Sequence, residues 1–176
     1  KKFLSQFAKH QFFTPFGPYS YIGWNSKKPY FQDKRVRWAL AHLVDKETIN
    51  KKLHFGLYHP ITGPYYPLGF NYNKELKPIE YDLEKAKELL QEAGWKDQDG
   101  DGILEKGGIP FRFTLMFSTG IQFYEQLTPI LRSNFLRAGI ELELRRLEAV
   151  TLFKKMHEHD FDAVMAGWGR GAGGED

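Results

Sequence analysis

The fold class of this 176-residue chain is decided by residues 111–168, which read FRFTLMFSTGIQFYEQLTPILRSNFLRAGIELELRRLEAVTLFKKMHEHDFDAVMAGW. Apolar residues alternate with others at 111–117 and at 140–144, and 161–168 is an apolar run of strand length. We therefore expect three strands here. Helices are expected between them at 120–138 and 150–158, with Gly139 ending the first helix. This strand–helix alternation favours right-handed crossovers and at least partly parallel strand pairing.

The N-terminal half adds one strand and three helices to this pattern. Residues 19–25 read as a strand bounded by turn residues. Asp33, Asp45 and Asp82 are suitable N-caps, so helices are expected at 34–44, 46–55 and 83–93. The stretch 59–78 is rich in Pro and Gly and is expected to form a loop at the surface or at the rim of a cleft.

Composition excludes several classes of function. The net charge is only +3 and basic residues are scattered among acidic ones, which disfavours nucleic-acid binding. No apolar run approaches the ~20 residues that span a bilayer. Cysteine is absent, which excludes thiol catalysis and disulfides. The chain starts on Lys1 and ends on Asp176 with the appearance of cuts inside a longer protein, so the lack of a signal peptide does not indicate a compartment.

The ends of the three C-terminal strands are the expected ligand site. In sheets with parallel strands, ligands sit at the carboxyl ends, here 117–120, 147–150 and 168–170. Ser118 and Thr119 follow the first of these strands. Trp168 ends the last strand, and Gly169 after it leaves the backbone accessible to a ligand. The indole of Trp168 can therefore form one wall of a pocket. A core Trp at a strand end is an equally good interpretation of this pattern.

A second candidate site lies in the Gly/Asp loop at 97–108. Asp97, Asp99 and Asp101 alternate as in a calcium loop, with Gly102 at the expected sharp turn. The bidentate Glu that closes such a site is replaced by Gly108. A polar turn in which Asp side chains accept backbone hydrogen bonds explains the same residues.

Catalytic motifs are absent from the sequence. We find no Gly-x-Ser-x-Gly elbow and no phosphate-binding Gly loop. His157 and His159 suggest a metal cluster, but on a helix residues two apart point to nearly opposite sides. A solvated helix end is the better interpretation. An enzyme is therefore not expected, and a hydrolase on a similar α/β lobe remains the alternative from another class.

Several segments together resemble the peptide/oligopeptide/nickel class of ABC-transporter solute-binding proteins (family 5). They are YIGWN at 21–25, PYFQDKRVRWAL at 29–40, VDKETI at 44–49 with Gly56, AKELLQEAGW at 86–95, the Asp-Gly loop, FDA at 161–163 and GW at 167–168. Each segment alone is weak evidence, but the order and spacing of the segments together are specific to this family. The resemblance covers residues 19–168.

The resemblance implies a type II periplasmic-binding-protein fold, in which two lobes close around a ligand. Residues 1–176 would form one domain, most of the C-terminal lobe, as a three-layer α/β structure with a mixed sheet and helices on both faces. The implied function is solute capture outside the cytoplasmic membrane and delivery to an ABC permease. The protein would be a monomer, periplasmic or extracellular, with a lipid anchor as one option. Peptide is the default ligand; sugars, nickel complexes and haem stay open, as does a peptide-sensing receptor.

The resemblance also implies ligand contacts. In peptide-binding members the strand ending in Ala-Gly-Trp lines the cleft, so Trp168 and Gly169 carry over as ligand-binding residues. Those members place an Arg where this chain has Met165, and an Asp shortly after the Trp, where Arg170 is the only charge. Both departures argue against the same recognition of peptide termini. Arg170 either meets an anionic ligand group or faces solvent.

Overall fold

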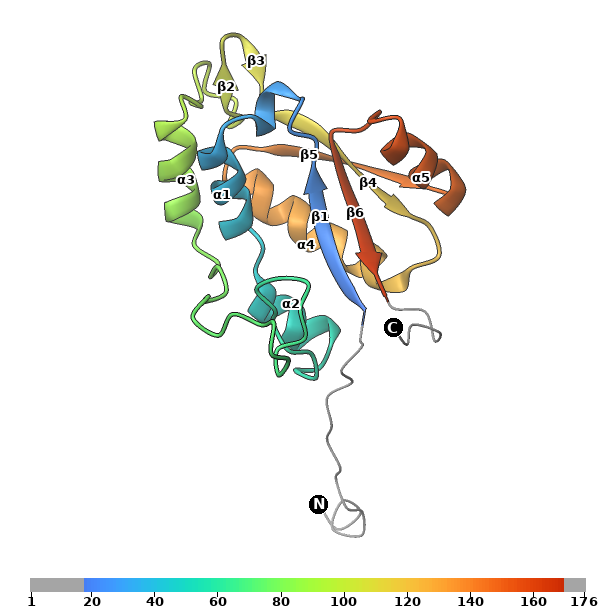
Figure 1. Ribbon diagram of the computed structural model, residues 1–176. Helices are drawn as coiled ribbons and strands as arrows, with labels where there is room; N and C mark the ends of the chain where they lie inside the picture. Colours follow the sequence, from blue (N-terminus) through green and yellow to red (C-terminus); the bar gives the residue numbers. More distant parts are fainter. Residues whose placement is uncertain (1–17, 170–176) are drawn as a thin grey trace, which may run out of the picture.

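The computed structural model describes residues 18–169 and shows a mixed α/β architecture (Figure 1). In chain order the elements are β1 (Tyr19–Trp24), the 3-10 helix η2 (Pro29–Phe31), α1 (Lys34–His42), α2 (Lys46–Leu53), α3 (Leu83–Glu92), β2 (Glu105–Lys106), β3 (Ile109–Pro110), β4 (Arg112–Ser118), α4 (Gln122–Arg137), β5 (Glu141–Leu147), α5 (Ala149–His157) and β6 (Ala163–Trp168). All five predicted helices and all four predicted strands are present.

The main sheet has four strands in the order β1-β6-β4-β5. Strand β4 pairs in parallel with both β5 and β6, as the strand–helix alternation predicts. Strand β1 is antiparallel to β6, with Tyr19 opposite Trp168 and Trp24 opposite Ala163. The sheet is therefore mixed. The short strands β2 and β3 form a separate antiparallel hairpin.

The core lies on both faces of this sheet because side chains alternate along each strand. Phe113 and Phe117 of β4 pack in the larger cluster with residues of α1, α3 and α4. Met116, between them, faces the other way and packs with Leu152 of α5 and Val164 of β6. Figure 1 shows α4 and α5 separated by the sheet. The predicted three layers are confirmed.

The helix starts follow the predicted caps. The side chain of Asp33 accepts from the Arg35 amide at 2.8 Å, and Asp45 and Asp82 act in the same way at α2 and α3. These bonds satisfy amides that have no partner inside the helix. Helices α1 and α2 each end two residues earlier than the sequence predicts, and α4 begins two residues later.

No helix among residues 18–169 is both long enough and apolar enough to cross a membrane.

Candidate ligand-binding site

The carboxyl ends of β4 and β6 lie at one edge of the sheet because the two strands are parallel neighbours. Ser118 ends β4, and the amide of Thr119 donates to the Leu147 carbonyl at the end of β5 (2.9 Å). The Thr119 hydroxyl donates to a carboxylate oxygen of Glu148 at 3.2 Å. The structure thus brings the ends of all three parallel strands together, as their alternation with helices predicts.

Trp168 projects from this edge. Its side chain is 59% exposed, which excludes the core interpretation within the described lobe. Gly169, next to it, is also exposed. An added Cβ at Gly169 would come no closer than 3.4 Å to Pro18, which is an ordinary contact. Pro18 thus lies on the side of Gly169 where a side chain would stand, and the exposed indole beside it offers a large apolar surface.

Two other predicted residues do not present a side chain to this edge. Met165 is 1% exposed and packs in the larger core cluster, and its backbone is paired with Ile22 on one side and Phe117 on the other. Because strand residues alternate between faces, Met165 points inward, and its prediction as a ligand contact is corrected. Ser118 is 9% exposed, and its hydroxyl donates to the Thr119 carbonyl at 3.2 Å. Arg170 lies outside the described residues.

Tyr124, in the first turn of α4, belongs to this edge although the sequence did not indicate it. Its ring is 4% exposed, and its hydroxyl makes a hydrogen bond with the Ser20 side chain. Burial raises the pKa of this phenol. An added Cβ at Gly167 would lie 3.3 Å from the Tyr124 hydroxyl and 3.1 Å from the Tyr19 carbonyl. The missing side chain of Gly167 thus lets α4 pack closely beneath the strand that carries Trp168.

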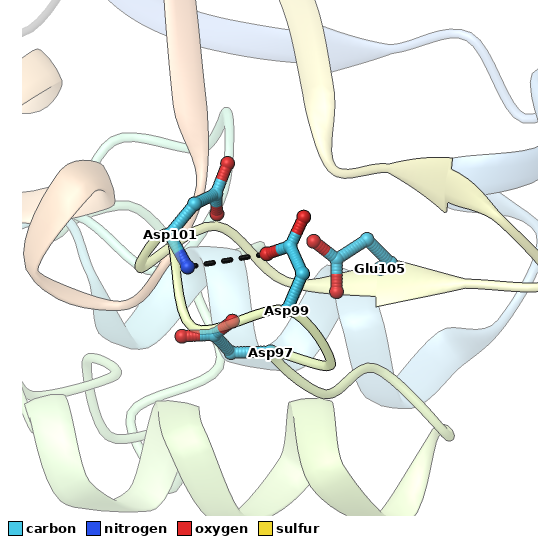
Figure 2. Close-up of side chains that lie close together, drawn as sticks. All are labelled: Asp97, Asp99, Asp101 and Glu105. Carbon is cyan, nitrogen blue, oxygen red and sulfur yellow. Dashed lines mark hydrogen bonds between the residues drawn. The ribbon is translucent and has the colours of Figure 1, made fainter.

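The Gly/Asp loop brings four carboxylates together (Figure 2). Asp97, Asp99, Asp101 and Glu105 each offer one oxygen, and these oxygens lie within 4.8 Å of one another. Glu105, at the start of β2, was not among the predicted ligands, because the closing Glu of a calcium loop stands at the twelfth position, which is Gly108 in this chain. The first three side chains are exposed. Calcium is bound by several oxygen ligands, and four carboxylates in one loop could supply them.

The same carboxylates are used by the loop's own backbone. Asp97 accepts from the amides of Gly100 at 2.7 Å and Gly102 at 3.0 Å. Asp101 accepts from Ile103 at 2.7 Å. These are the bonds that the polar-turn interpretation predicts. Calcium binding by this loop stays a prediction.

The His157–His159 segment shows no metal-binding arrangement. Among residues 18–169, the Asp97 loop is the only group of three or more potential ligands that converge on one point. His157 ends α5, and His159 follows the helix with a positive φ of 56°. The His159 carbonyl accepts from the Asn25 side chain at 3.1 Å, so this turn ties α5 to the end of β1.

The three-layer α/β lobe has the type II periplasmic-binding-protein fold, because it superposes on solute-binding proteins of that fold. Residues 2–176 match the family described as bacterial extracellular solute-binding proteins, family 5, middle region. The chain belongs to this family, which confirms the resemblance seen in its sequence.

Two members of this family show which solute-binding proteins the chain is similar to. It is 40% identical over 154 residues to the oligopeptide-binding protein AppA of Bacillus subtilis, an alignment that covers 85% of this chain and 28% of AppA. The AppA structure in complex with a nonapeptide superposes with a TM-score of 0.82 at 38% identity, covering 88% of this chain and 32% of AppA. NikZ of Campylobacter jejuni, in complex with Ni(L-His), gives 0.72 at 28% identity over 87% of this chain and 30% of NikZ. The chain thus spans about a third or less of these relatives.

Proposed function

We propose that this chain is the C-terminal lobe of a two-lobed solute-binding protein that captures peptides outside the cytoplasmic membrane for an ABC permease. The observation that carries the proposal is the exposed Trp168 at the carboxyl edge of the sheet. The name of AppA, an oligopeptide-binding protein at 40% identity, supports peptide as the ligand class. The family description and the Ala166-Gly167-Trp168 ending of β6 support the same function.

In this function the lobe binds its ligand and does not catalyse a reaction. An extended peptide along the edge would lay an apolar side chain on the Trp168 indole and form hydrogen bonds with the backbone of the exposed Gly169. The second lobe would close over it, because closure is favoured by contacts that exist only in the closed state. We propose that no bond is made or broken and that the full-length protein is a monomer without catalytic activity. It would be periplasmic or extracellular, with a lipid anchor as one option.

Recognition of peptide ends is proposed to differ from that implied by the family pattern. The position of the expected Arg is occupied by Met165, whose side chain is buried in the core. The charge that follows Trp168 in the sequence is Arg170. We propose that Arg170 meets an anionic group of the ligand. An Arg170→Ala variant of the full-length protein should then bind more weakly, and unchanged affinity would remove this contact.

The ligand itself is best identified by native mass spectrometry of the full-length protein purified from its host. A co-purified mass equal to a peptide is expected. A mass equal to a nickel complex, a sugar or haem would replace peptide as the ligand class.

The site is tested by calorimetric titration of the full-length protein with a pool of synthetic nonapeptides. Trp168→Ala should weaken binding about tenfold or more, because a buried aromatic contact contributes on the order of 1.4 kcal/mol or above. Trp38→Ala is the matched control, since Trp38 is 53% exposed but lies on α1. Equal affinities of the two variants would contradict the proposed site.

A further inference from the structure

The segment between α2 and α3 exposes an unusual set of large apolar side chains. We call six of them the apolar rim: Phe55, Leu57, Tyr58, Tyr65, Leu68 and Phe70. Phe70 is 98% exposed and Leu68 is 69% exposed. Residues 53–73 contain no Asp, Glu, Lys or Arg, in a chain that is 27% charged overall. Enrichment in aromatic residues and loss of charge are the marks of an interface core.

This segment has a defined shape although it contains neither helix nor strand. The Asn50 side chain of α2 donates to the Tyr58 carbonyl at 2.8 Å and accepts from the Tyr58 amide at 3.1 Å. The hydroxyls of Thr62 and Tyr72 are 3.1 Å apart and hydrogen-bonded. These contacts hold the apolar rim in place from both ends. The apolar side chains of the rim are therefore exposed on a loop that is held by hydrogen bonds.

The apolar rim is continuous with the ligand edge. The His54 ring stacks on Tyr58 with ring centroids 3.7 Å apart, and its other neighbour is Phe123 of α4, at 4.6 Å. Phe123 is followed by Tyr124, whose hydroxyl lies against Gly167, immediately before Trp168. Figure 1 shows α2 and its following loop on the same side of the molecule as the start of β1 and the end of β6.

We propose that the apolar rim is the surface on which the second lobe of the same polypeptide docks when the protein closes on its ligand. This inference rests on the proposed two-lobed function. The aligned part of AppA is only 28% of that relative, so most of such a polypeptide lies outside this lobe. Because Tyr19 pairs with Trp168, the chain enters β1 and leaves β6 at the same edge. Connections to a second lobe would therefore leave from this edge, on the side of the molecule where the loop after α2 lies (Figure 1).

Two other occupants fit less well. An anionic membrane surface attracts basic amphipathic segments, whereas residues 53–73 carry no Lys or Arg. A second copy of the chain could also bury the apolar rim. The two copies would not be covalently linked, so their association would depend on protein concentration. Docking within one polypeptide avoids that dependence, since linked partners have a high effective concentration.

Hydroxyl-radical footprinting of the full-length protein tests the proposal, with and without a pool of synthetic nonapeptides. We expect Tyr65 and Phe70 to become protected on peptide addition by about threefold or more, as buried interface aromatics are. Leu136, exposed at the far end of α4, is the internal control and should not change. Protection of Trp168 without Phe70 would overturn the docking surface and leave the proposed function intact. Protection of Phe70 without Trp168 would support the docking surface and contradict Trp168 as the ligand contact. No protection of either residue would overturn both proposals.

A double variant, Leu68→Ser with Phe70→Ser, provides the second arm. Both side chains are exposed, so the melting temperature should change little, and circular dichroism checks the fold. The peptide-induced decrease in radius of gyration should be lost, whereas Leu136→Ser should keep it. Closure like that of the wild type would refute docking at the apolar rim. A dimer of the wild type that the double variant disperses would assign the surface to a second copy instead, as liposome binding lost in the double variant would assign it to a membrane.

Discussion

Gly139, at the end of α4, should be among the least replaceable residues of this lobe. Its φ is +80°, a conformation that costs an L-residue roughly 1–2 kcal/mol. An added Cβ would lie only 2.7 Å from Leu104 Cγ and 3.3 Å from the Gly102 carbonyl. Relieving such a clash costs a further ~1–3 kcal/mol. The Gly139 carbonyl also accepts from the Leu104 amide at 2.8 Å, so the backbone has little freedom to move away. We expect Gly139→Ala to reduce the free energy of unfolding by about 2–5 kcal/mol.

The matched control is Gly108→Ala in the β2–β3 hairpin. Its φ is +75°, but nothing lies within 4 Å of the added Cβ, so this variant carries the backbone cost alone, roughly 1–2 kcal/mol. Urea unfolding of the 176-residue chain, followed by circular dichroism, measures both variants with a common m-value. Equal losses would show that the contact with Leu104 is not tight and would refute the packing argument.

Four further variants test other parts of the lobe. Asn25→Ala should cost about 2–3 kcal/mol in urea unfolding, because this buried side chain donates to two carbonyls and accepts one amide. Tyr124→Phe should cost only about 1 kcal/mol in the same assay, since it removes one hydrogen bond and keeps the packing. Asp97→Ala should lower stability by about 1 kcal/mol in metal-free buffer, and millimolar calcium should not shift the melting temperature of the wild type if the loop is a polar turn. The Arg35 side chain lowers the pKa of Asp33 to about 2, so this carboxylate stabilises the fold above its unfolded pKa. The destabilisation by Asp33→Ala should therefore shrink as the pH falls from about 4 to about 2.

Much of the fold follows from local sequence signals. Each Asp cap binds a backbone amide at its own helix start, so it acts within a few residues and can be read from the sequence. The alternation along β4 fixes which side chains face each layer. Helix ends were less accurate: α2 stops at Leu53, where the backbone turns through Phe55 and Gly56 with positive φ. The sequence predicted Gly56 as the stop, but not that the helix would already end at Leu53.

The candidate site was only partly predictable, because its residues come from distant segments. Trp168 was located correctly at the strand end, but its exposure depends on how β1 and α4 pack around β6. Met165 was placed at the site by family pattern alone, and strand alternation turns it into the core. Tyr124 was missed since nothing in the sequence of α4 shows that its hydroxyl meets Ser20, more than a hundred residues earlier. Glu105 was missed because the loop closes around a residue nearer than the twelfth position.

The antiparallel strand β1 explains how a change elsewhere in the polypeptide can reach the ligand edge. If β1 ran parallel to β6, its first residue would lie at the opposite edge of the sheet, far from Trp168. As it is, Tyr19 is paired with Trp168, and Ser20 with Gly167, on which the Tyr124 hydroxyl packs. A rotation of the chain at the start of β1 would therefore act on residues that hold Trp168. Hinge motions are absorbed by a few residues at the ends of such elements. The edge that is proposed to bind the ligand is thus also the edge at which closure of a second lobe would be felt first.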